Sequence, residues 1–225
     1  MIKVLRGNKP VSLENNSEQW TNDFLQQLII KGEYSKVERT YKEKYRQTDV
    51  QIELEKMYGE KCCFCETGIG TSDYGHIEHR CPKSLSKFHN LIFEWNNLHW
   101  GCNRCNTNKG SKWDDDNPIL DPTVDDPINH FHFDIAKCEA VAYKKNSRGQ
   151  TTIDHVDLNR NSLIKARKKI RNTLLVYING FKNTTDPKDE EIFENLILEM
   201  VKPNISEGNK AEYSMFIKQI MDQYL

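Results

Sequence analysis

The stretch from Tyr74 to Trp113, YGHIEHRCPKSLSKFHNLIFEWNNLHWGCNRCNTNKGSKW, carries the most distinctive chemistry of this chain. It contains a glutamate followed by a histidine, Glu78-His79, and a CxxCNxxK motif at positions 102–109. A second CxxC pair begins just upstream, at Cys62. Two thiol pairs with an acid-histidine step between them predict a site that a metal ion holds together.

The four cysteines of the two pairs, Cys62, Cys65, Cys102 and Cys105, are predicted to bind one zinc ion. Thiolates suit zinc, and a closed shell of four thiolates is typical of a structural ion. Residues 66–101 separate the pairs, whereas a compact zinc ribbon has about 15–20 residues there, so a sizeable element must be looped out. The alternative is a set of buried free cysteines, because Cys is among the most buried residue types.

Composition limits the class of protein. The chain has 225 residues, a formal net charge of −1 and seven cysteines, an odd number that fits metal binding in a reducing compartment better than a disulfide framework. No apolar run is long enough to span a membrane, and MIKVLRGNKP lacks the apolar core of a signal peptide, so we expect a cytoplasmic protein without membrane contact. Near-neutral charge argues against tight binding of nucleic acid by this chain alone, because such binding relies on Lys and Arg. A partner could supply the missing positive charge.

Hydrophobic spacing predicts helices before the central stretch. Residues 2–10 read as a short strand or an extended arm, and a helix runs from Ser17 to a stop at Gly32. The charged segment 33–46 is expected to be a solvated helix or loop. A capping box at 48–51 is expected to open another helix, which ends at Gly59.

After the central stretch, residues 130–133 alternate like a strand, and 140–143 and 151–153 are expected to pair with it across a turn at Arg148-Gly149. Further helices are predicted from Asn161 to Gly180, from Asp186-Pro187, and over residues 206–224. The first of these helices has a basic face, which is most often only solvated and alternatively contacts nucleic acid. That face consists of Lys165, Arg167, Lys168, Lys169 and Arg171.

The ordered motif residues resemble those of HNH (ββα-metal) endonucleases. The acid-His-x-x-Pro opening lies at 78–82, Asn97 follows, and Cys-Asn-x-x-Lys closes the pattern, with Asn in place of the third His as in HNN variants. The resemblance implies an α+β fold: a ββα-metal core with a four-cysteine zinc knuckle, embedded in N- and C-terminal helices. It implies a single nuclease domain over residues 1–225. This domain would comprise a helical N-terminal arm (1–60), the zinc-stapled HNH core (61–118) and a hairpin with a helical C-terminal extension (119–225).

The resemblance also implies catalytic roles. His79 would be the general base, Glu78 and Asn106 would bind a divalent ion, and Asn97 would brace the loop that orients His79. The chemistry suits these residue types, because an imidazole can deprotonate water near neutral pH and oxygen ligands suit Mg²⁺ or Mn²⁺.

Three nearby cations, Arg104, Lys109 and Lys112, are candidate contacts to nucleic-acid phosphates.

The candidate catalytic residues also have a plainer interpretation. A lone acid-histidine pair is usually a surface feature, and Asn97 and Asn106 could be turn residues. The ordered set favours the nuclease.

Four sequence segments point to one subfamily of HNH proteins: IEHRCPKS, FEWNNLHWGCNRCNTNKGSKW, NPILDPTVDDPINHFHF and GQTTIDHVDLNRNSLIKARKKI. They are similar to the PtuB-like HNH effector subunits of Septu-type and retron-associated antiphage systems, over roughly residues 50–175. Arg80-Cys81 departs from the aromatic-Arg step of most relatives. The resemblance implies an ABC-type, SMC-like ATPase partner (PtuA-like).

Two other functions stay open. The same motif could cleave RNA, for example tRNA, instead of the expected DNA, because the ion and the base act on phosphate and read no base. Alternatively, the chain is a non-catalytic zinc-knuckle module that binds nucleic acid or serves as an adaptor.

Overall fold

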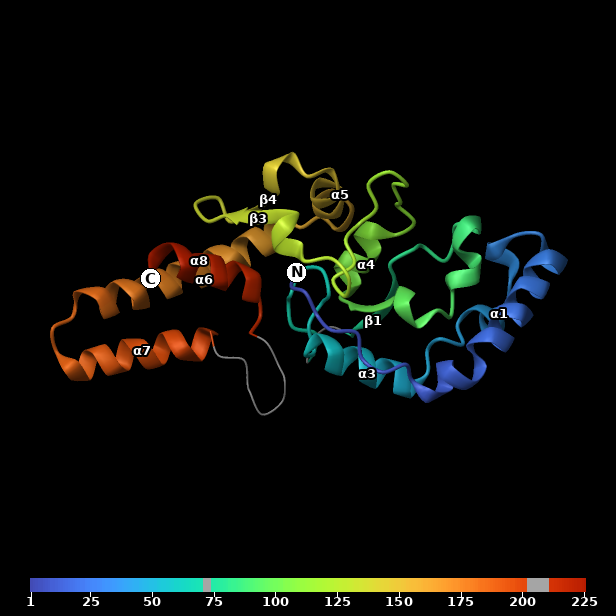
Figure 1. The fold of residues 1–225 in the computed structure, drawn as a ribbon, viewed down its shortest axis with the longest axis horizontal. Coiled ribbons are helices and arrows are strands. Elements are labelled where there is room, and N and C mark those ends of the chain that lie inside the picture. The colour runs from blue at the N-terminus through green and yellow to red at the C-terminus, as the bar shows by residue number, and fades with distance from the viewer. Residues whose placement is uncertain (71–73, 202–210) are drawn as a thin grey trace.

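The fold is described from a computed structural model, over residues 1–70, 74–201 and 211–225. At its centre, strands β1 (His76–His79) and β2 (Leu98–Gly101) pair antiparallel, with His76 opposite Gly101 and His79 opposite Leu98. Helix α4 (Asn103–Lys109) follows β2 at once and packs on β1, which completes a ββα unit (Figure 1). All four residues of β2 are buried, so this strand forms the inner layer of the unit.

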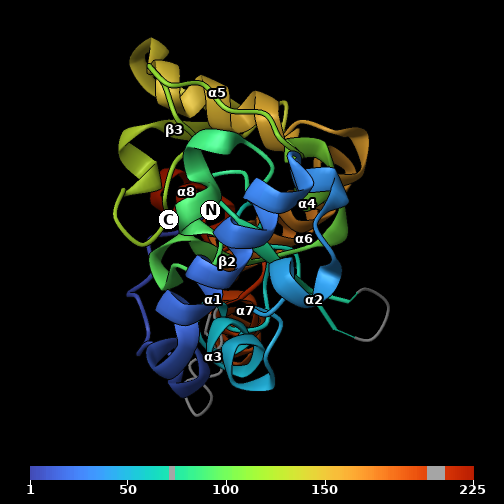
Figure 2. The ribbon, with the colours of Figure 1, turned by 90° about the vertical axis from the view of Figure 1, so that its right-hand side faces the viewer.

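The N-terminal segment wraps around one side of this unit. An extended arm leads into α1 (Val11–Lys31), a short α2 (Arg39–Lys42) and α3 (Thr48–Tyr58), and α3 packs on β2. Seen from the side on which α1 lies, α1 and α2 are in front of the central strands (Figure 2). Two short 3-10 helices, Ser86–Leu91 and Trp95–Asn97, lie in the long loop between β1 and β2.

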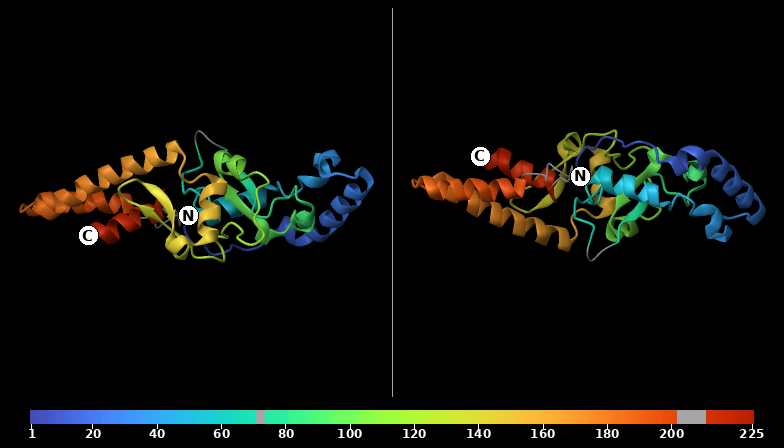
Figure 3. Two further views of the ribbon diagram at one scale, coloured as in Figure 1. Left: turned by 90° about the horizontal axis from the view of Figure 1, so that it is seen from above. Right: turned by 90° about the horizontal axis from the view of Figure 1, so that it is seen from below.

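The described residues of the C-terminal part contain a second two-stranded sheet and four α-helices. Strands β3 (Phe131–Asp134) and β4 (Glu139–Ala142) form a hairpin, and α5 (Ser147–Val156) packs between β4 and α4. Helices α6 (Asn161–Asn183) and α7 (Pro187–Val201) form an antiparallel pair that extends away from the ββα unit, on the side opposite α1 (Figure 3). Helix α8 (Ser214–Tyr224) packs on α6 and β3.

These elements confirm the α+β class, with small antiparallel sheets among many helices. In the part of the chain that the structure describes, no helix is both long and apolar enough to cross a membrane. The predicted beginning of the last helix at residue 206 lies outside the described residues.

The expected third strand at 151–153 is wrong, because these residues belong to α5. The Asn146 side chain caps this helix by accepting a hydrogen bond from the Gly149 backbone N–H (2.9 Å), a common way to begin a helix. A Cβ at Gly149 would lie 2.1 Å from the His130 carbonyl oxygen, so only glycine allows the helix to approach the hairpin this closely. The hairpin turns instead just before β4, at Cys138, whose φ is +62°.

Two other expectations also need correction. Helix α1 begins at Val11 rather than Ser17, and Asp49 holds its first turn by accepting hydrogen bonds from the Ser12 N–H (2.8 Å) and hydroxyl (2.7 Å). Asp49 therefore serves α1, and α3 has no side-chain cap of its own. On α6, Arg167 is buried and donates to two backbone oxygens at 2.7 Å, so it is not part of a solvated basic face.

Candidate active site and zinc site

The four predicted cysteines come together in one buried cluster. The Sγ atoms of Cys62, Cys65, Cys102 and Cys105 all lie within 4.8 Å of one another. The Sγ atoms of Cys65 and Cys102 are 3.9 Å apart. A tetrahedral zinc ion with Zn–S bonds of about 2.3 Å requires thiolates about 3.8 Å apart. The cluster therefore has the donor type, number and spacing that could hold zinc.

Groups around the cluster support the thiolates. Arg160, just before α6, donates from Nη1 to Cys105 Sγ at 3.4 Å, and Cys102 caps α4 by accepting from the Cys105 N–H. The first cysteine pair lies in a loop, residues 61–68, whose ends bridge at Lys61 and Gly68. A zinc ion shared by all four sulfur atoms would fix where α4 begins relative to this loop.

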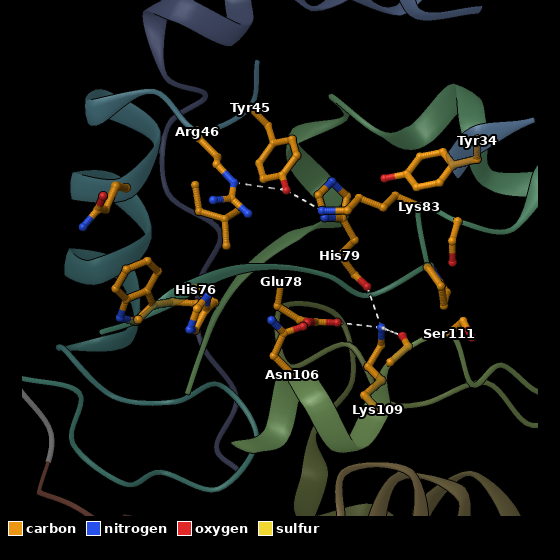
Figure 4. A pocket seen from close by; sticks show the side chains of 17 residues that line it. Tyr34, Tyr45, Arg46, His76, Glu78, His79, Lys83, Asn106, Lys109 and Ser111 are labelled. Atoms are coloured by element: carbon orange, nitrogen blue, oxygen red, sulfur yellow. Dashed lines mark hydrogen bonds and ion pairs between the residues drawn. The ribbon is translucent and has the colours of Figure 1, made fainter. Parts of the chain in front are cut away.

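The acid-histidine step lies beside a cavity of about 450 Å³, away from the thiol cluster (Figure 4). Glu78, His79, Asn106 and Lys109 all line this cavity, so β1 and α4 deliver their motif residues to one place. Across the cavity, the N-terminal segment contributes a wall whose members are Tyr34, Tyr45, Arg46 and Gln51. Figure 4 shows His79 between that wall and the Glu78 side of the cavity.

His79 is held so that one ring nitrogen remains available. Its Nε2 lies 2.9 Å from the Ile92 carbonyl oxygen, which can only accept, so Nε2 carries the proton and Nδ1 is an acceptor. The Tyr45 ring packs edge-on against the imidazole, with the two ring centres 4.5 Å apart. Burial, with a further contribution from the Lys83 charge, lowers the pKa of His79 well below its usual value. The imidazole is therefore neutral at physiological pH and can take up a proton.

Glu78 and Lys109 form a buried ion pair. Lys109 Nζ lies 2.6 Å from Glu78 Oε1 and donates to the His79 carbonyl oxygen at 2.7 Å, and the two side chains are only 3% (Glu78) and 1% (Lys109) exposed. Burial raises the pKa of Glu78, and Lys109 opposes this rise. Asn106, one turn before Lys109, lies beside Glu78 in the cavity (Figure 4). The pair of oxygen donors, one carboxylate and one amide, fits the chemistry of a Mg²⁺ or Mn²⁺ site.

Asn97 lies outside the cavity and closes the loop between the strands. Its Oδ1 accepts from the Cys81 N–H (2.7 Å), and its Nδ2 donates to the carbonyl oxygens of Cys81 and Leu91 (both 3.1 Å). Ile92, which holds His79, follows Leu91 directly. Asn97 therefore fixes the backbone that positions the imidazole.

The three predicted phosphate contacts are not grouped. Arg104 and Lys112 are exposed and do not line the cavity, whereas Lys109 lines it with its ammonium group already paired. The predicted phosphate contacts do not include the other cations of the cavity, Arg46 and Lys83. Lys83 follows the motif proline and could have been found from that position, but nothing in the sequence linked Arg46 to this site.

His76 also lines the cavity, on the same face of β1 as Glu78, because side chains two residues apart share a face of a strand. The HNH motif pattern does not include His76. Its position makes it a neighbour of the candidate ion-binding oxygens.

Sequence comparisons give three similar proteins. The chain is 33% identical over 161 residues to the Septu protein PtuB of Bacillus thuringiensis, a match over 71% of this chain and 55% of that protein, so the chain spans about half of this relative's length. It is 26% identical over 199 residues to the Septu protein PtuB of Bacillus mycoides, covering 76% of this chain and 67% of that protein.

A third relative, from Vibrio cholerae, is named as the proposed HNH endonuclease of retron Vc95. It is 26% identical over 191 residues, a match over 81% of this chain and 88% of that protein. No protein-family model matches the chain. By its sequence relatives and its ββα unit with a four-cysteine cluster, the protein is similar to the PtuB-like HNH proteins of Septu-type and retron-associated systems.

Proposed function

We propose that the protein is a metal-dependent HNH endonuclease that hydrolyses phosphodiester bonds, with DNA as the expected substrate. The observation that carries this proposal is the charge of the cavity around Glu78 and His79. Among the described residues that line it are three cations, Arg46, Lys83 and Lys109, and one carboxylate, that of Glu78. A chain with a net charge of −1 thus concentrates positive charge where its motif residues meet, which suits an anionic substrate.

The geometry supports division of the chemistry among these residues. Nδ1 of His79 takes a proton from the attacking water, whose oxygen bonds to phosphorus as the bond to the leaving 3′ oxygen breaks. Glu78 and Asn106 present the oxygens that would hold Mg²⁺ or Mn²⁺. When bound, such an ion neutralises the charge that develops on the phosphate and on the leaving oxygen. The zinc ion of the cysteine cluster would be structural, because four thiolates leave it no open position.

The names of the relatives support a wider role. We place the protein in an antiphage defence system of the Septu or retron type, in the cytoplasm, working with an ABC/SMC-like (PtuA-like) ATPase. The near-neutral net charge is in keeping with a nuclease that relies on a partner for much of its affinity for nucleic acid.

A cleavage assay tests the proposal. Plasmid DNA and total RNA are incubated with zinc-loaded protein and Mg²⁺ or Mn²⁺, with and without a PtuA-like ATPase. We expect cleavage of DNA that is lost in His79→Ala and kept in the matched variant His132→Ala, which alters a half-buried histidine on β3 outside the cavity. Zinc content and the melting temperature show whether the variants are folded.

Each other outcome has a defined meaning. Cleavage of RNA alone would change the substrate and keep the mechanism. Cleavage by His79→Ala equal to that of the wild type would remove His79 as the base. A wild type that cuts neither substrate under any of these conditions would favour the non-catalytic adaptor.

A further inference from the structure

Two cations of the cavity wall are held together by one buried tyrosine. Arg46 donates from Nε to the Tyr45 hydroxyl oxygen at 3.5 Å, and Lys83 donates from Nζ to the same oxygen. Both also lie over the ring, with Arg46 Cζ 5.8 Å and Lys83 Nζ 4.5 Å from its centre. Tyr45 is 1% exposed, so the ring is fixed in the core while the two charges reach the cavity.

These charges are poorly neutralised within the protein. Lys83 has no carboxylate within ion-pair distance among the described residues. The partner of Arg46, Glu43, lies 3.6 Å away, and the Arg46 side chain is 59% exposed, a setting in which ion pairs contribute little. Two neighbouring cations that a buried ring holds in place repel each other, and an anion between them would relieve this repulsion.

The cations also lie next to the proposed catalytic base. The ring that carries them packs against the His79 imidazole, and all of these residues line one cavity with Glu78 and Asn106. An anion bound between Arg46 and Lys83 would therefore be adjacent to the reacting phosphate. A guanidinium and an ammonium are the groups that proteins use for backbone phosphates.

We propose that Arg46 and Lys83 form a phosphate clamp, which binds the sugar-phosphate backbone of the nucleic-acid strand to be cut. This inference rests on the proposed nuclease function and adds a substrate-binding role for the N-terminal segment. The clamp recognises phosphate charge and reads no base, so it binds strands of any sequence. Tyr45 is a positioning residue that fixes both cations relative to His79.

The test measures binding without cleavage. The zinc-loaded full chain is titrated with a fluorescent DNA oligonucleotide, single-stranded or duplex, in the absence of Mg²⁺ and Mn²⁺ and at several salt concentrations. The slope of log K against log salt is negative, and each lost phosphate contact reduces its magnitude by about 0.9 for duplex DNA and about 0.7 for a single strand. We expect this decrease in Arg46→Gln and in Lys83→Gln, and about twice this decrease in the double variant.

Matched controls separate the clamp from general charge effects and from misfolding. Arg39→Gln and Lys87→Gln remove exposed cations outside the cavity and should leave the slope unchanged. Lys83→Arg keeps the charge and should restore the wild-type slope, whereas a merely structural lysine would give no such rescue. Melting temperatures are measured for all variants.

The inference is overturned if the slopes of Arg46→Gln and Lys83→Gln equal those of the controls, or if the wild type does not bind the oligonucleotides. Because binding is measured without cleavage, failure of the clamp and failure of the nuclease proposal give different results. Slopes that depend on both cations, in a protein that never cleaves, would keep the clamp and remove the nuclease. Cleavage with unchanged slopes would do the reverse.

Discussion

Replacing Lys109 by methionine should destabilise the protein strongly, because it leaves the Glu78 carboxylate buried without its counter-charge. The two side chains are almost inaccessible and their charged atoms are 2.6 Å apart. Removing one partner of a buried ion pair typically costs about 3–5 kcal/mol. That is a large share of the roughly 5–15 kcal/mol by which a domain is stable, so Lys109→Met should be marginally folded.

Two further measurements assign this loss to the stranded charge. The double variant Glu78→Gln/Lys109→Met removes both charges and should recover most of the lost stability. A divalent ion bound at Glu78 and Asn106 would also replace the missing positive charge. Because the variant lacks this positive charge and the wild type does not, Mg²⁺ or Mn²⁺ should stabilise Lys109→Met more than the wild type. Ligand binding stabilises a protein by about 2.7 kcal/mol at a concentration 100 times Kd.

The assay is urea unfolding followed by circular dichroism, on zinc-loaded protein at neutral pH, with and without the divalent ion. Lys112→Met is the matched control, because Lys112 is exposed and outside the cavity; we expect a change within about 0.5 kcal/mol. A loss below about 1 kcal/mol in Lys109→Met would refute the reasoning, since it would place the pair among ordinary surface ion pairs. So would a double variant no more stable than the single one.

Three other outcomes are expected. Cys102→Ser should lose zinc and melt at lower temperature, while Cys81→Ser, outside the cluster, should keep its full zinc content by metal analysis. Asn97→Ala leaves two carbonyl groups and one N–H of the loop without their partner and should cost about 2–4 kcal/mol in urea unfolding, against almost nothing for the exposed Asn96→Ala. Burial lowers the pKa of His99 to about 3, and a nearby aspartate opposes this shift. The contribution of the neutral His99 to stability is therefore complete above about pH 6.5 and is lost as the pH falls from there towards 3. Unfolding free energies measured down this range should fall by at most about 1.4 kcal/mol per pH unit more in the wild type than in His99→Gln.

The features that the sequence predicted correctly are those that its motif residues indicate. The CxxC spacing marks the four thiols as a set, whereas the ββα unit was expected only from the resemblance of the ordered motif residues to HNH endonucleases; the structure has it as β1, β2 and α4. The meeting of the two thiol pairs across residues 66–101 was inferred from the four ligands that zinc requires, and the structure places these sulfur atoms together.

The features that it missed depend on contacts between distant segments. Residues 151–153 were expected to be a strand because Thr and Ile favour strands, but the contact of Gly149 with His130 and the Asn146 cap decide for a helix. Similarly, the charged segment 33–46 looked like a solvated connection. Its Tyr45 is instead buried against His79, and that packing brings Arg46 into the cavity.

The loop of residues 61–68 also links the thiol cluster to the C-terminal helix. Lys61 donates to the Ala211 carbonyl oxygen (2.9 Å) and the Ser214 hydroxyl (3.2 Å), while the Thr67 and Tyr213 hydroxyls lie 3.0 Å apart. A zinc ion bound by the cluster would thus hold the loop that anchors the segment leading into α8. By thermodynamic reciprocity, a protein that binds α8 and holds it on this loop would raise the affinity for zinc, and zinc would raise the affinity for that protein by the same factor. Retention of the metal and assembly with a partner would then be two measurements of one coupling free energy.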